Sequence, residues 1–247
     1  LVKKLPQTWH DAAQERRKKL ESESPVTHND VDVNYEVVPK HASEEYDGKK
    51  LSMKSGYFIK TLSEMLPENK IIFDEALTNS PPVNKYLPGR VPGDRMLTRG
   101  GSLGTGFPGA IGAKIAHPDR CVVGFSGDGG SMYTIQCLWT AARHNVAAKF
   151  VVCQNRSYKL LQANISKFWE ERGIEGREFP IPFDLSKPEI CFNEIAGSFG
   201  VAGERVVRPD QVKDAIARML AYDGPYLINL VLDGAIRPDL IGVRCGQ

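Results

Sequence analysis

Short apolar runs alternate with amphipathic stretches over residues 51–233. The apolar runs have the length of buried strands and lie at residues 70–76, 95–99, 121–128, 149–153, 201–207 and 226–233. The stretches with apolar residues at helical spacing lie at residues 51–66, 100–116, 131–145, 157–173, 193–199 and 209–222. Continuous apolar strands that alternate with helices are typical of a parallel sheet covered on both faces. We therefore predict an α/β fold, a doubly wound parallel sheet of about six strands with helices on both faces.

Polarity divides the chain into three parts. Residues 1–50 are rich in polar and charged residues, and we interpret them as a linker or leader segment that packs on a missing domain or partner. Residues 51–233 form the predicted domain, within which residues 78–82 read as a polar turn. Residues 234–247 have no clear period and are interpreted as a tail that closes over the site as a lid, or as an unstructured terminus. Because the chain begins at Leu1, we expect a fragment or a trimmed subunit.

Composition argues against several classes of protein. Hydrophobic residues make up 41% and charged residues 25% of the 247 positions, as in globular domains. A net charge of +2 without a basic stripe argues against nucleic-acid binding. No apolar run approaches the roughly 20 residues that span a bilayer, and no signal peptide is recognised. The five cysteines show no ligand spacing, which fits a reducing, cytoplasmic compartment.

Two polar side chains come at the ends of neighbouring predicted strands. Asp128 ends the third strand and Asn155 follows the fourth. The carboxyl ends of parallel strands meet at one edge of a sheet, where ligands bind. A carboxylate and an amide oxygen, with the backbone carbonyl of Ser157 just after them, suit Mg²⁺, which takes further oxygens from a phosphate. The alternatives are that Asp128 caps a helix beginning at Ser131 and that Asn155 is a turn residue.

Glycines surround Asp128 at Gly127, Gly129 and Gly130. Glycines at such a turn let consecutive backbone N–H groups converge on an anion, and the next helix begins with the positive end of its dipole towards it. The sequence therefore predicts a seat for a cation and a phosphate at this edge of the sheet.

A second glycine pattern, Gly104-x-Gly106-x-x-Gly109, follows a strand and opens a helix. With Asp128 at the end of the next strand, it matches the fingerprint of a nicotinamide-dinucleotide site. The alternative without a ligand is a turn whose glycines let a strand and a helix pack closely. Pro108 inside the turn and the glycines after Asp128 weaken the dinucleotide interpretation.

Three segments resemble one enzyme family. GDGGSMYTIQCLWTAARHNVAAKFVVCQNRSY is similar to the diphosphate-binding motif of thiamine-diphosphate-dependent enzymes, in the branch of benzoylformate decarboxylase and acetolactate synthase. RGGSLGTGFPGAIGAKIAHPDR and FDLSKPEICFNEIAGSFGVAGERV resemble the same branch. The resemblance spans residues 51–233 and matches only the C-terminal, diphosphate-binding domain of the family. It implies thiamine diphosphate and Mg²⁺ as cofactors.

The resemblance also implies roles for single residues. It makes Asp128, Asn155 and the carbonyl of Ser157 the Mg²⁺ ligands. It makes the backbone N–H groups of Gly129 and Gly130 the donors to the diphosphate.

Further positions match cofactor contacts of the family. Leu103 matches the apolar residue that wedges between the thiazolium and aminopyrimidine rings. Gly101 matches the residue whose carbonyl accepts a hydrogen bond from the pyrimidine amino group. The other positions implied to lie near the diphosphate, the cofactor or the substrate mouth are Thr78, Asn79, Gly127, Tyr158 and Leu161.

The chain departs from the family pattern at three positions. Gln154 stands where Asn is usual, so hydrogen bonding beside the metal ligands must differ. Lys159 stands where Gly is common, and Gly130 replaces a frequent Ser.

One catalytic part of the family has no counterpart here. In the family a Glu on a separate pyrimidine-binding domain protonates the cofactor ring, and the glutamates Glu36, Glu44, Glu45 and Glu75 lack its context. We therefore expect no catalytic residue in this chain, which would be inactive alone. We expect a complementary chain with the pyrimidine-binding domain in a hetero- or homo-oligomer, a dimer of dimers.

The expected function is that of the diphosphate-binding subunit or fragment of a thiamine-diphosphate- and Mg²⁺-dependent 2-oxo-acid decarboxylase, carboligase or C–C lyase. A 2-hydroxyacyl-CoA or oxalyl-CoA lyase is an alternative within the family. A nicotinamide-dinucleotide oxidoreductase and a non-catalytic assembly partner are alternatives outside it. The substrate is expected to be a small 2-oxo acid, aldehyde or acyl-CoA, and no motif identifies it further.

Overall fold

A computed structural model describes residues 11, 15, 53–98 and 101–232. The predictions for the tail at residues 234–247, and for all but two positions of the leader at residues 1–50, lie outside these residues. Contacts divide the chain into a unit of residues 1–32 and a unit of residues 33–247. The described residues from 53 onward all belong to the second unit.

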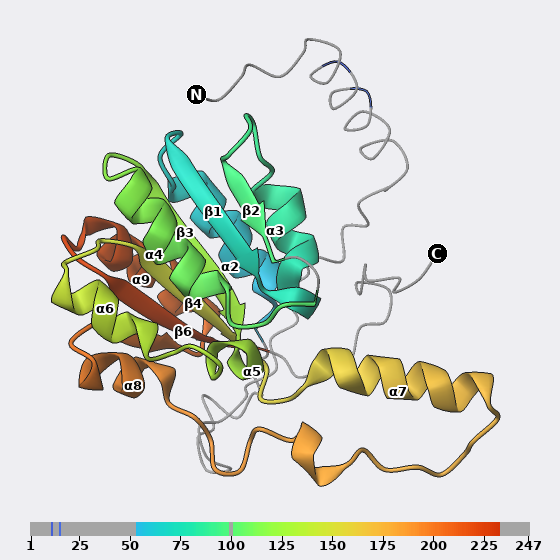
Figure 1. Cartoon of the computed structure of the whole chain (residues 1–247). Helices are drawn as coiled ribbons and strands as arrows, with labels where there is room; N and C mark the ends of the chain where they lie inside the picture. The colour runs from blue at the N-terminus through green and yellow to red at the C-terminus, as the bar shows by residue number, and fades with distance from the viewer. Residues whose placement is uncertain (1–10, 12–14, 16–52, 99–100, 233–247) are drawn as a thin grey trace. The chain divides into compact units, whose positions relative to one another are not determined.

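Six parallel strands form one sheet within the described part of this unit (Figure 1). They are β1 Lys70–Glu75, β2 Arg95–Leu97, β3 Cys121–Gly127, β4 Lys149–Gln154, β5 Ala202–Val206 and β6 Tyr226–Val231. Their order across the sheet is β2-β1-β3-β4-β6-β5, and each neighbouring pair is parallel. Every strand lies within or overlaps a predicted run, so the doubly wound α/β fold is confirmed.

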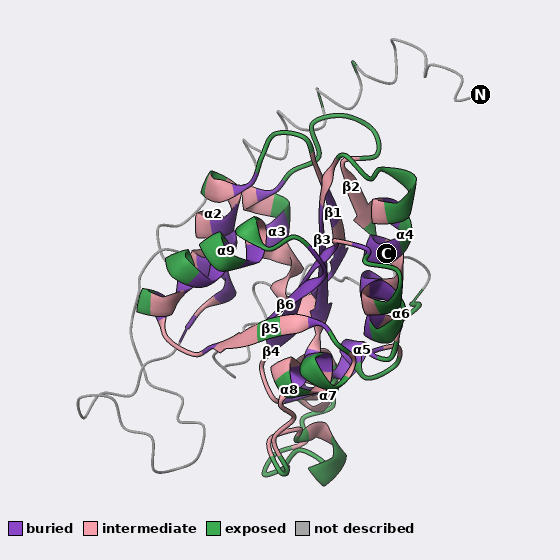
Figure 2. Ribbon diagram, turned by 90° about the vertical axis from the view of Figure 1, so that its left-hand side faces the viewer, coloured by how far each residue is buried: buried purple, intermediate pink, exposed green. Residues whose placement is uncertain are grey.

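Helices cover both faces of the sheet. They are α2 Ser55–Met65, α3 Ser80–Tyr86, α4 Gly106–Ala116, α5 Asp128–Ser131, α6 Cys137–Arg143, α7 Lys159–Glu171, α8 Phe192–Ser198 and α9 Val212–Ala221, with 3₁₀ turns η2 Leu77–Asn79, η3 Ile181–Phe183 and η4 Pro209–Gln211. Figure 2 shows α2, α3 and α9 on one side of the sheet and α4 and α6 on the other. In the part of the chain that the structure describes, no helix has the length and apolar character needed to cross a membrane.

Alternate strand residues contribute to two separate hydrophobic clusters, because successive side chains of a strand point to opposite faces. The strand residues that pack with α2, α3 and α9 include Ile72, Val123, Phe125, Val151 and Ile228. Those that pack with α4, α6 and α8 include Ile71, Val122, Phe150, Val152 and Leu227. Burial on both faces explains why these strands read as continuous apolar runs in the sequence.

The turn predicted for residues 78–82 is wrong. This segment forms η2 and the first turn of α3, which begins at Ser80. Pro81 and Pro82 occupy that first turn, where the N–H group that proline lacks would have no partner within the helix. The proline pair therefore begins a helix here instead of preventing one.

The helix predicted for residues 131–145 begins later than expected, as α6 Cys137–Arg143. α5 ends at Ser131, residues 132–136 form turns, and α6 begins at Cys137. Ile135 and Leu138 are buried, as their spacing predicts, but Trp139 is 53% exposed. Within α6 the buried residues are Leu138 and Ala141, so its buried stripe excludes Trp139.

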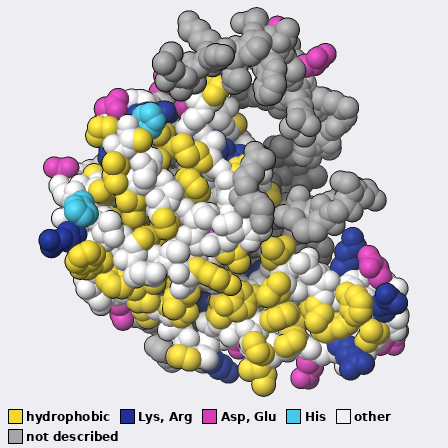
Figure 3. Space-filling view, viewed as in Figure 1, with side chains coloured by type: hydrophobic (Ala, Val, Ile, Leu, Met, Phe, Trp, Pro, Cys, Tyr) yellow, Lys and Arg dark blue, Asp and Glu magenta, His cyan; other side chains and the backbone are white. Residues whose placement is uncertain are grey.

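α7 has the predicted apolar stripe but does not bury it. Of its 13 residues, all of which the structure describes, only Gln162 is buried. Leu161 and Phe168 are about half exposed, and Trp169 stacks on Phe179 of the following loop with 5.6 Å between ring centroids. Figure 3 shows the hydrophobic side chains along α7, which extends away from the sheet in Figure 1.

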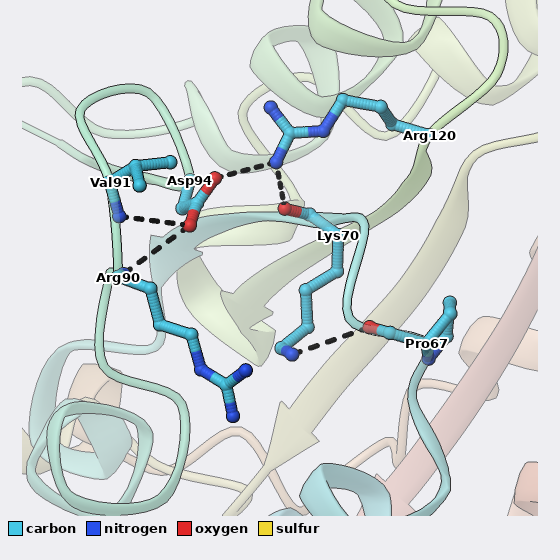
Figure 4. A network of polar contacts seen from close by, with 6 residues as sticks. All are labelled: Pro67, Lys70, Arg90, Val91, Asp94 and Arg120. Carbon is cyan, nitrogen blue, oxygen red and sulfur yellow. Dashed lines mark hydrogen bonds and ion pairs between the residues drawn. The ribbon is translucent and has the colours of Figure 1, made fainter.

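A polar network joins the amino ends of β1, β2 and β3 (Figure 4). The Arg120 guanidinium donates to the carbonyl of Lys70, where β1 begins, and to the Asp94 carboxylate at 2.6 Å. Asp94 also accepts the N–H groups of Arg90 at 3.3 Å and Val91 at 3.1 Å. Partial burial raises the pKa of Asp94, but these hydrogen bonds outweigh it, so the pKa lies below its ordinary value. The network lies at the opposite end of the strands from the predicted site.

Two glycines of α4 provide a test of the packing between this helix and the sheet. A Cβ on Gly109 would lie 2.2 Å from Cε2 of Phe73 in β1, whereas a Cβ on Gly112 would meet nothing within 4 Å. Gly109→Ala should lower the free energy of unfolding by about 1–3 kcal/mol through overpacking. Gly112→Ala should raise it by about 0.5–1 kcal/mol through helix propensity. Urea unfolding measures both, and equal effects of the two substitutions would contradict the packing described.

Candidate functional site

Strand register aligns the carboxyl ends of β1, β3 and β4. Glu75, the last residue of β1, pairs with Ser126 of β3, and Gly127 of β3 pairs with β4. The residues just beyond the strands meet, because Oδ2 of Asp128 accepts the N–H of Arg156 at 2.6 Å. The structure therefore brings the two predicted turns into contact at one edge of the sheet.

Asp128 is the first residue of α5 and is only 4% exposed. Its Oδ1 accepts the N–H of Gly129 at 2.9 Å, and its Oδ2 accepts that of Arg156. The N-cap of α5 is Gly127, so the alternative in which Asp128 caps a helix beginning at Ser131 is wrong.

Burial also determines the titration of Asp128. Desolvation raises its pKa to about 6, against the lowering effect of the hydrogen bonds from Gly129 and Arg156. A nearby positive charge favours the ionised form of a carboxyl group. A cation bound here would therefore stabilise the ionised form of Asp128, which burial disfavours.

Asn155 begins a turn that another loop holds in place. Its Oδ1 accepts the N–H of Ser157 at 3.1 Å. The carbonyl of Phe183 accepts both the Ser157 hydroxyl at 2.9 Å and the Tyr158 N–H at 3.0 Å. The carbonyl of Ser157 accepts the N–H of Lys159 at 2.9 Å. Asn155 is thus a turn residue, and its oxygen and that of Ser157 each keep a second lone pair for a metal ion.

Close packing explains the two glycines after Asp128. A Cβ on Gly129 would lie 2.4 Å from Cε1 of Tyr158, and a Cβ on Gly130 would lie 3.0 Å from Oγ of Ser126. The ring of Tyr158 therefore lies directly against the turn at Asp128. This contact links the predicted cofactor residue Tyr158 to the predicted metal ligand.

Glu75 is the polar residue of this edge that the sequence analysis did not assign to the site. It is 1% exposed, and its Oε1 and Oε2 accept the N–H groups of Gly104 and Gly106, each at 2.5 Å. Burial raises its pKa above the ordinary value despite these donors. The signal in the sequence was the one used for Asp128, an acid at the end of a buried apolar run.

The Glu75 carboxylate changes the interpretation of the Gly104-x-Gly106-x-x-Gly109 pattern. In a dinucleotide site the N–H groups of such a turn meet the pyrophosphate, but here those of Gly104 and Gly106 bind an internal acid. Gly109 faces the ring of Phe73. The pattern is therefore a closely packed strand-to-helix turn, which argues against the nicotinamide-dinucleotide alternative.

The loop that leads into α4 exposes Leu103 between two anchors. The hydroxyl of Thr98 donates to the carbonyl of Ser102 at 2.5 Å, and that of Thr134 donates to the carbonyl of Gly104 at 2.6 Å. Leu103 between them is 40% exposed. A large apolar side chain held in this way is available for contact with a ligand.

The remaining predicted residues lie on neighbouring elements. Gly101 has a φ of 71°, which favours glycine, and begins the loop of Leu103. Thr78 and Asn79 lie in η2, which contacts β3 and α7. Leu161 lies on α7 and is half exposed. Hydrogen bonds between these residues and Asp128 are absent among the described residues.

Gln154 has a structural contact at the position where the family pattern has Asn. Its Nε2 donates to the carbonyl of Ile190 at 2.7 Å, and the side chain is buried. Its Oε1 has no hydrogen-bond partner among the described residues. The amide thus ties the end of β4 to the loop before α8.

The oxygen ligands at this edge carry little charge of their own. Within residues 53–98 and 101–232, no group of three or more His, Cys, Asp or Glu side chains is placed to hold a metal ion. One carboxylate, one amide oxygen and one backbone carbonyl are hard ligands that suit Mg²⁺ when a phosphate supplies further oxygens. The residues present therefore fit a metal held jointly with a diphosphate.

Comparison with known proteins decides between the remaining families. The model of the family described as "Thiamine pyrophosphate enzyme, C-terminal TPP binding domain" matches residues 83–230. The chain belongs to this family. Thiamine pyrophosphate is another name for thiamine diphosphate, so the family expected from the three sequence segments is confirmed.

Relatives of this thiamine pyrophosphate enzyme domain are about 30% identical to it over the aligned residues. Benzoylformate decarboxylase of Pseudomonas aeruginosa is 30% identical over 169 residues, which cover 68% of this chain and 30% of that protein. The acetolactate synthase isozyme 2 large subunit of Escherichia coli is 29% identical over 189 residues, 76% of this chain and 33% of that subunit. The chain thus spans about a third of the length of these relatives.

A solved structure shares the fold. The thiamine diphosphate-dependent 4-hydroxybenzoylformate decarboxylase of Rhodococcus jostii RHA1 superposes with a TM-score of 0.68 at 27% identity. The match covers 81% of this chain and 36% of that one.

The pKa of Asp128 predicts a pH dependence of stability in the metal-free chain. Because burial raises the pKa from 3.8 to about 6, the folded chain binds more protons here than the unfolded chain between these values. The contribution of Asp128 to the free energy of unfolding therefore falls as the pH rises through this window. Relative to Asp128→Asn, the wild type should lose up to about 3 kcal/mol between about pH 4 and about pH 7. Urea unfolding of both proteins over this range measures the difference, and a rise with pH would contradict it.

Proposed function

We propose that this chain is the diphosphate-binding part of a thiamine-diphosphate- and Mg²⁺-dependent 2-oxo-acid decarboxylase, carboligase or C–C lyase. The observation that carries the proposal is the hydrogen bond from the Arg156 N–H to the buried Asp128 carboxylate, at 2.6 Å. It joins the end of β3 to the turn of Asn155, the two segments that resemble the family's metal and diphosphate motif.

Mg²⁺ would be held by Asp128, the side-chain oxygen of Asn155 and the carbonyl of Ser157. Three protein oxygens leave room for diphosphate oxygens in a shell of about six. The raised pKa of Asp128 supports the assignment, since a cation offsets the desolvation that raises it. The diphosphate would lie against the turn of Gly127, Gly129 and Gly130.

The organic half of the cofactor would lie towards the loop before α4. The carbonyl of Gly101 would accept a hydrogen bond from the pyrimidine amino group, and Leu103 would separate the two rings. The exposure of Leu103 between two hydrogen-bonded anchors supports this role. The other residues proposed near the diphosphate, the cofactor or the substrate mouth are Thr78, Asn79, Tyr158 and Leu161.

Bound thiamine diphosphate would supply the carbanion chemistry that breaks or forms a C–C bond beside a carbonyl group. The residues of this chain would bind the diphosphate, orient the rings and exclude water. The Glu that protonates the pyrimidine would come from a pyrimidine-binding domain outside these residues. Glu75 is not available for that step, because its two oxygens bind Gly104 and Gly106.

The domain boundaries belong to the same proposal. Residues 51–233 would form the cofactor domain, residues 1–50 a linker and residues 234–247 a tail over the site. The chain would be inactive alone and would work in an oligomer, a dimer of dimers, with the pyrimidine-binding domain. The four cysteines of the described residues are free, which supports a cytoplasmic compartment.

The names of the relatives favour one substrate class. Benzoylformate, which the Pseudomonas relative decarboxylates by name, is a 2-oxo acid. We therefore place a 2-oxo acid before an acyl-CoA thioester as the substrate, with the acyl-CoA lyase as the second candidate. An assay with both classes of compound separates the two.

Removal of the proposed metal ligand should abolish cofactor binding. Asp128→Ala should weaken Mg²⁺-dependent binding of thiamine diphosphate at least about 100-fold, because it removes the only charged ligand. Isothermal titration with and without Mg²⁺ measures this. Asp119→Ala, at an exposed position before β3, is the matched control and should bind as the wild type does. Equal binding by Asp128→Ala would refute the metal site.

Truncation of Leu103 should weaken binding of the thiamine rings without weakening binding of the diphosphate. Leu103→Ala should weaken thiamine diphosphate about tenfold through lost apolar contact and leave inorganic diphosphate with Mg²⁺ unchanged. Because the side chain is 40% exposed, its loss should change the free energy of unfolding by less than about 1 kcal/mol. Competition binding of the two ligands is the measurement. If Leu103→Ala weakened the binding of both ligands equally, Leu103 would not contact the thiamine rings.

A further inference from the structure

Glu75 is a buried acid to which the proposed function gives no part. It ends β1 and appears in none of the salt bridges among the described residues. Burying an ionisable group without an opposite charge is costly. Its hydrogen bonds therefore indicate what the carboxylate does at this position.

The carboxylate holds both ends of one tight turn. Oε1 binds the N–H of Gly104 and Oε2 that of Gly106, each at 2.5 Å. Gly106 is also the first residue of α4, so the acid lies at the positive end of that helix dipole. A Cβ on Gly106 would approach Oε2 to 2.8 Å, which shows how closely the turn packs on the acid. Gln offers only one acceptor oxygen and would direct an NH₂ group at one of the two N–H donors.

The strand that carries Glu75, β1, is held by hydrogen bonds to a neighbouring strand on each side. β1 lies between β2 and β3, and Glu75 itself pairs with Ser126. The turn at Asp128 is held by different donors, the N–H groups of Gly129 and Arg156. The loop before α4 and the turn at Asp128 are therefore held by different carboxylates, although a Cβ on Gly130 would lie 3.6 Å from Oε1 of Glu75.

We propose that Glu75 is a positioning residue of the cofactor site, which fixes the loop of residues 101–106 at the end of β1. It thereby places the carbonyl of Gly101 and the side chain of Leu103 for the thiamine rings. This inference rests on the proposed function, which assigns those two residues to the organic half of the cofactor. Glu75 acts on ring binding more than on diphosphate binding, because the hydrogen bonds that hold the turn at Asp128 do not involve it.

The test is Glu75→Gln in the assembled protein, with Glu204→Gln as the matched control. Glu204 is a partly buried acid of β5 that accepts hydrogen bonds from Arg218 at 2.6 Å and Tyr226 at 2.7 Å, on a strand that is not adjacent to β1. Amide hydrogen exchange of residues 104–106 reports the loop without any ligand. Competition binding of thiamine diphosphate and inorganic diphosphate, both with Mg²⁺, reports the two halves of the site.

We expect Glu75→Gln to speed exchange at residues 104–106 and to reduce the preference for thiamine diphosphate over diphosphate about tenfold. Glu204→Gln should change neither quantity, even where it lowers the melting temperature. Unchanged exchange in Glu75→Gln, or faster exchange with the preference intact, would overturn the positioning role. A wild-type protein that binds thiamine diphosphate no more tightly than diphosphate would overturn the proposed function, and this inference with it.

A milder variant keeps the test decisive if Glu75→Gln does not fold. Glu75→Asp keeps the charge but shortens the side chain by one methylene group, so that its carboxylate no longer reaches both N–H groups. It should reduce the preference for thiamine diphosphate in the same direction and by a smaller factor. A preference equal to that of the wild type would count against the inference.

Discussion

The parallel register of β1, β3 and β4 is the constraint on which the site depends. Glu75 pairs with Ser126, and Gly127 pairs with β4, so three strands end at one level. Strands buried on both faces carry few polar side chains between their ends; Asn229 of β6 is an exception. The acids at the ends of β1 and β3 and the amide after β4 therefore gather at one edge, where backbone N–H groups of the following turns can reach them.

Two buried carboxylates at this edge are used differently. Glu75 is enclosed by the turn before α4, with each oxygen bound to one N–H group. Asp128 binds one N–H of its own turn and one of the next, and its pKa rises to about 6. Both solutions avoid a buried counter-ion. The hydrogen bonds of Glu75 fix the turn before α4. Those of Asp128 leave oxygen lone pairs that suit a metal ion.

The strands were predictable from the sequence because burial on both faces leaves uninterrupted apolar runs, as in β4, where all six residues are buried. The helices were less predictable from the sequence. The proline pair of α3 was interpreted as a turn, although prolines fit the first turn of a helix. The turns at residues 132–136, before α6, show that apolar spacing alone does not reveal where a helix begins.

Glu75 shows why the sequence did not define the whole site. Asp128 and Asn155 directly follow β3 and β4, which are neighbours in the sheet and are separated in the chain only by α5 and α6. β1 is also a neighbour of β3, but η2, α3, β2 and α4 lie between them in the sequence. The glycine pattern of α4 resembled a ligand-binding turn because a buried carboxylate and a phosphate need the same N–H groups.

The most direct measurement is a crystal structure of the assembled protein with thiamine diphosphate and Mg²⁺. We predict a metal ion about 2.0–2.1 Å from oxygens of Asp128 and Asn155, with the diphosphate against Gly129 and the rings beside Leu103. Glu75 should keep its contacts with Gly104 and Gly106. A metal ion bound elsewhere, or a cofactor whose diphosphate does not touch the turn of Asp128, would contradict the site described.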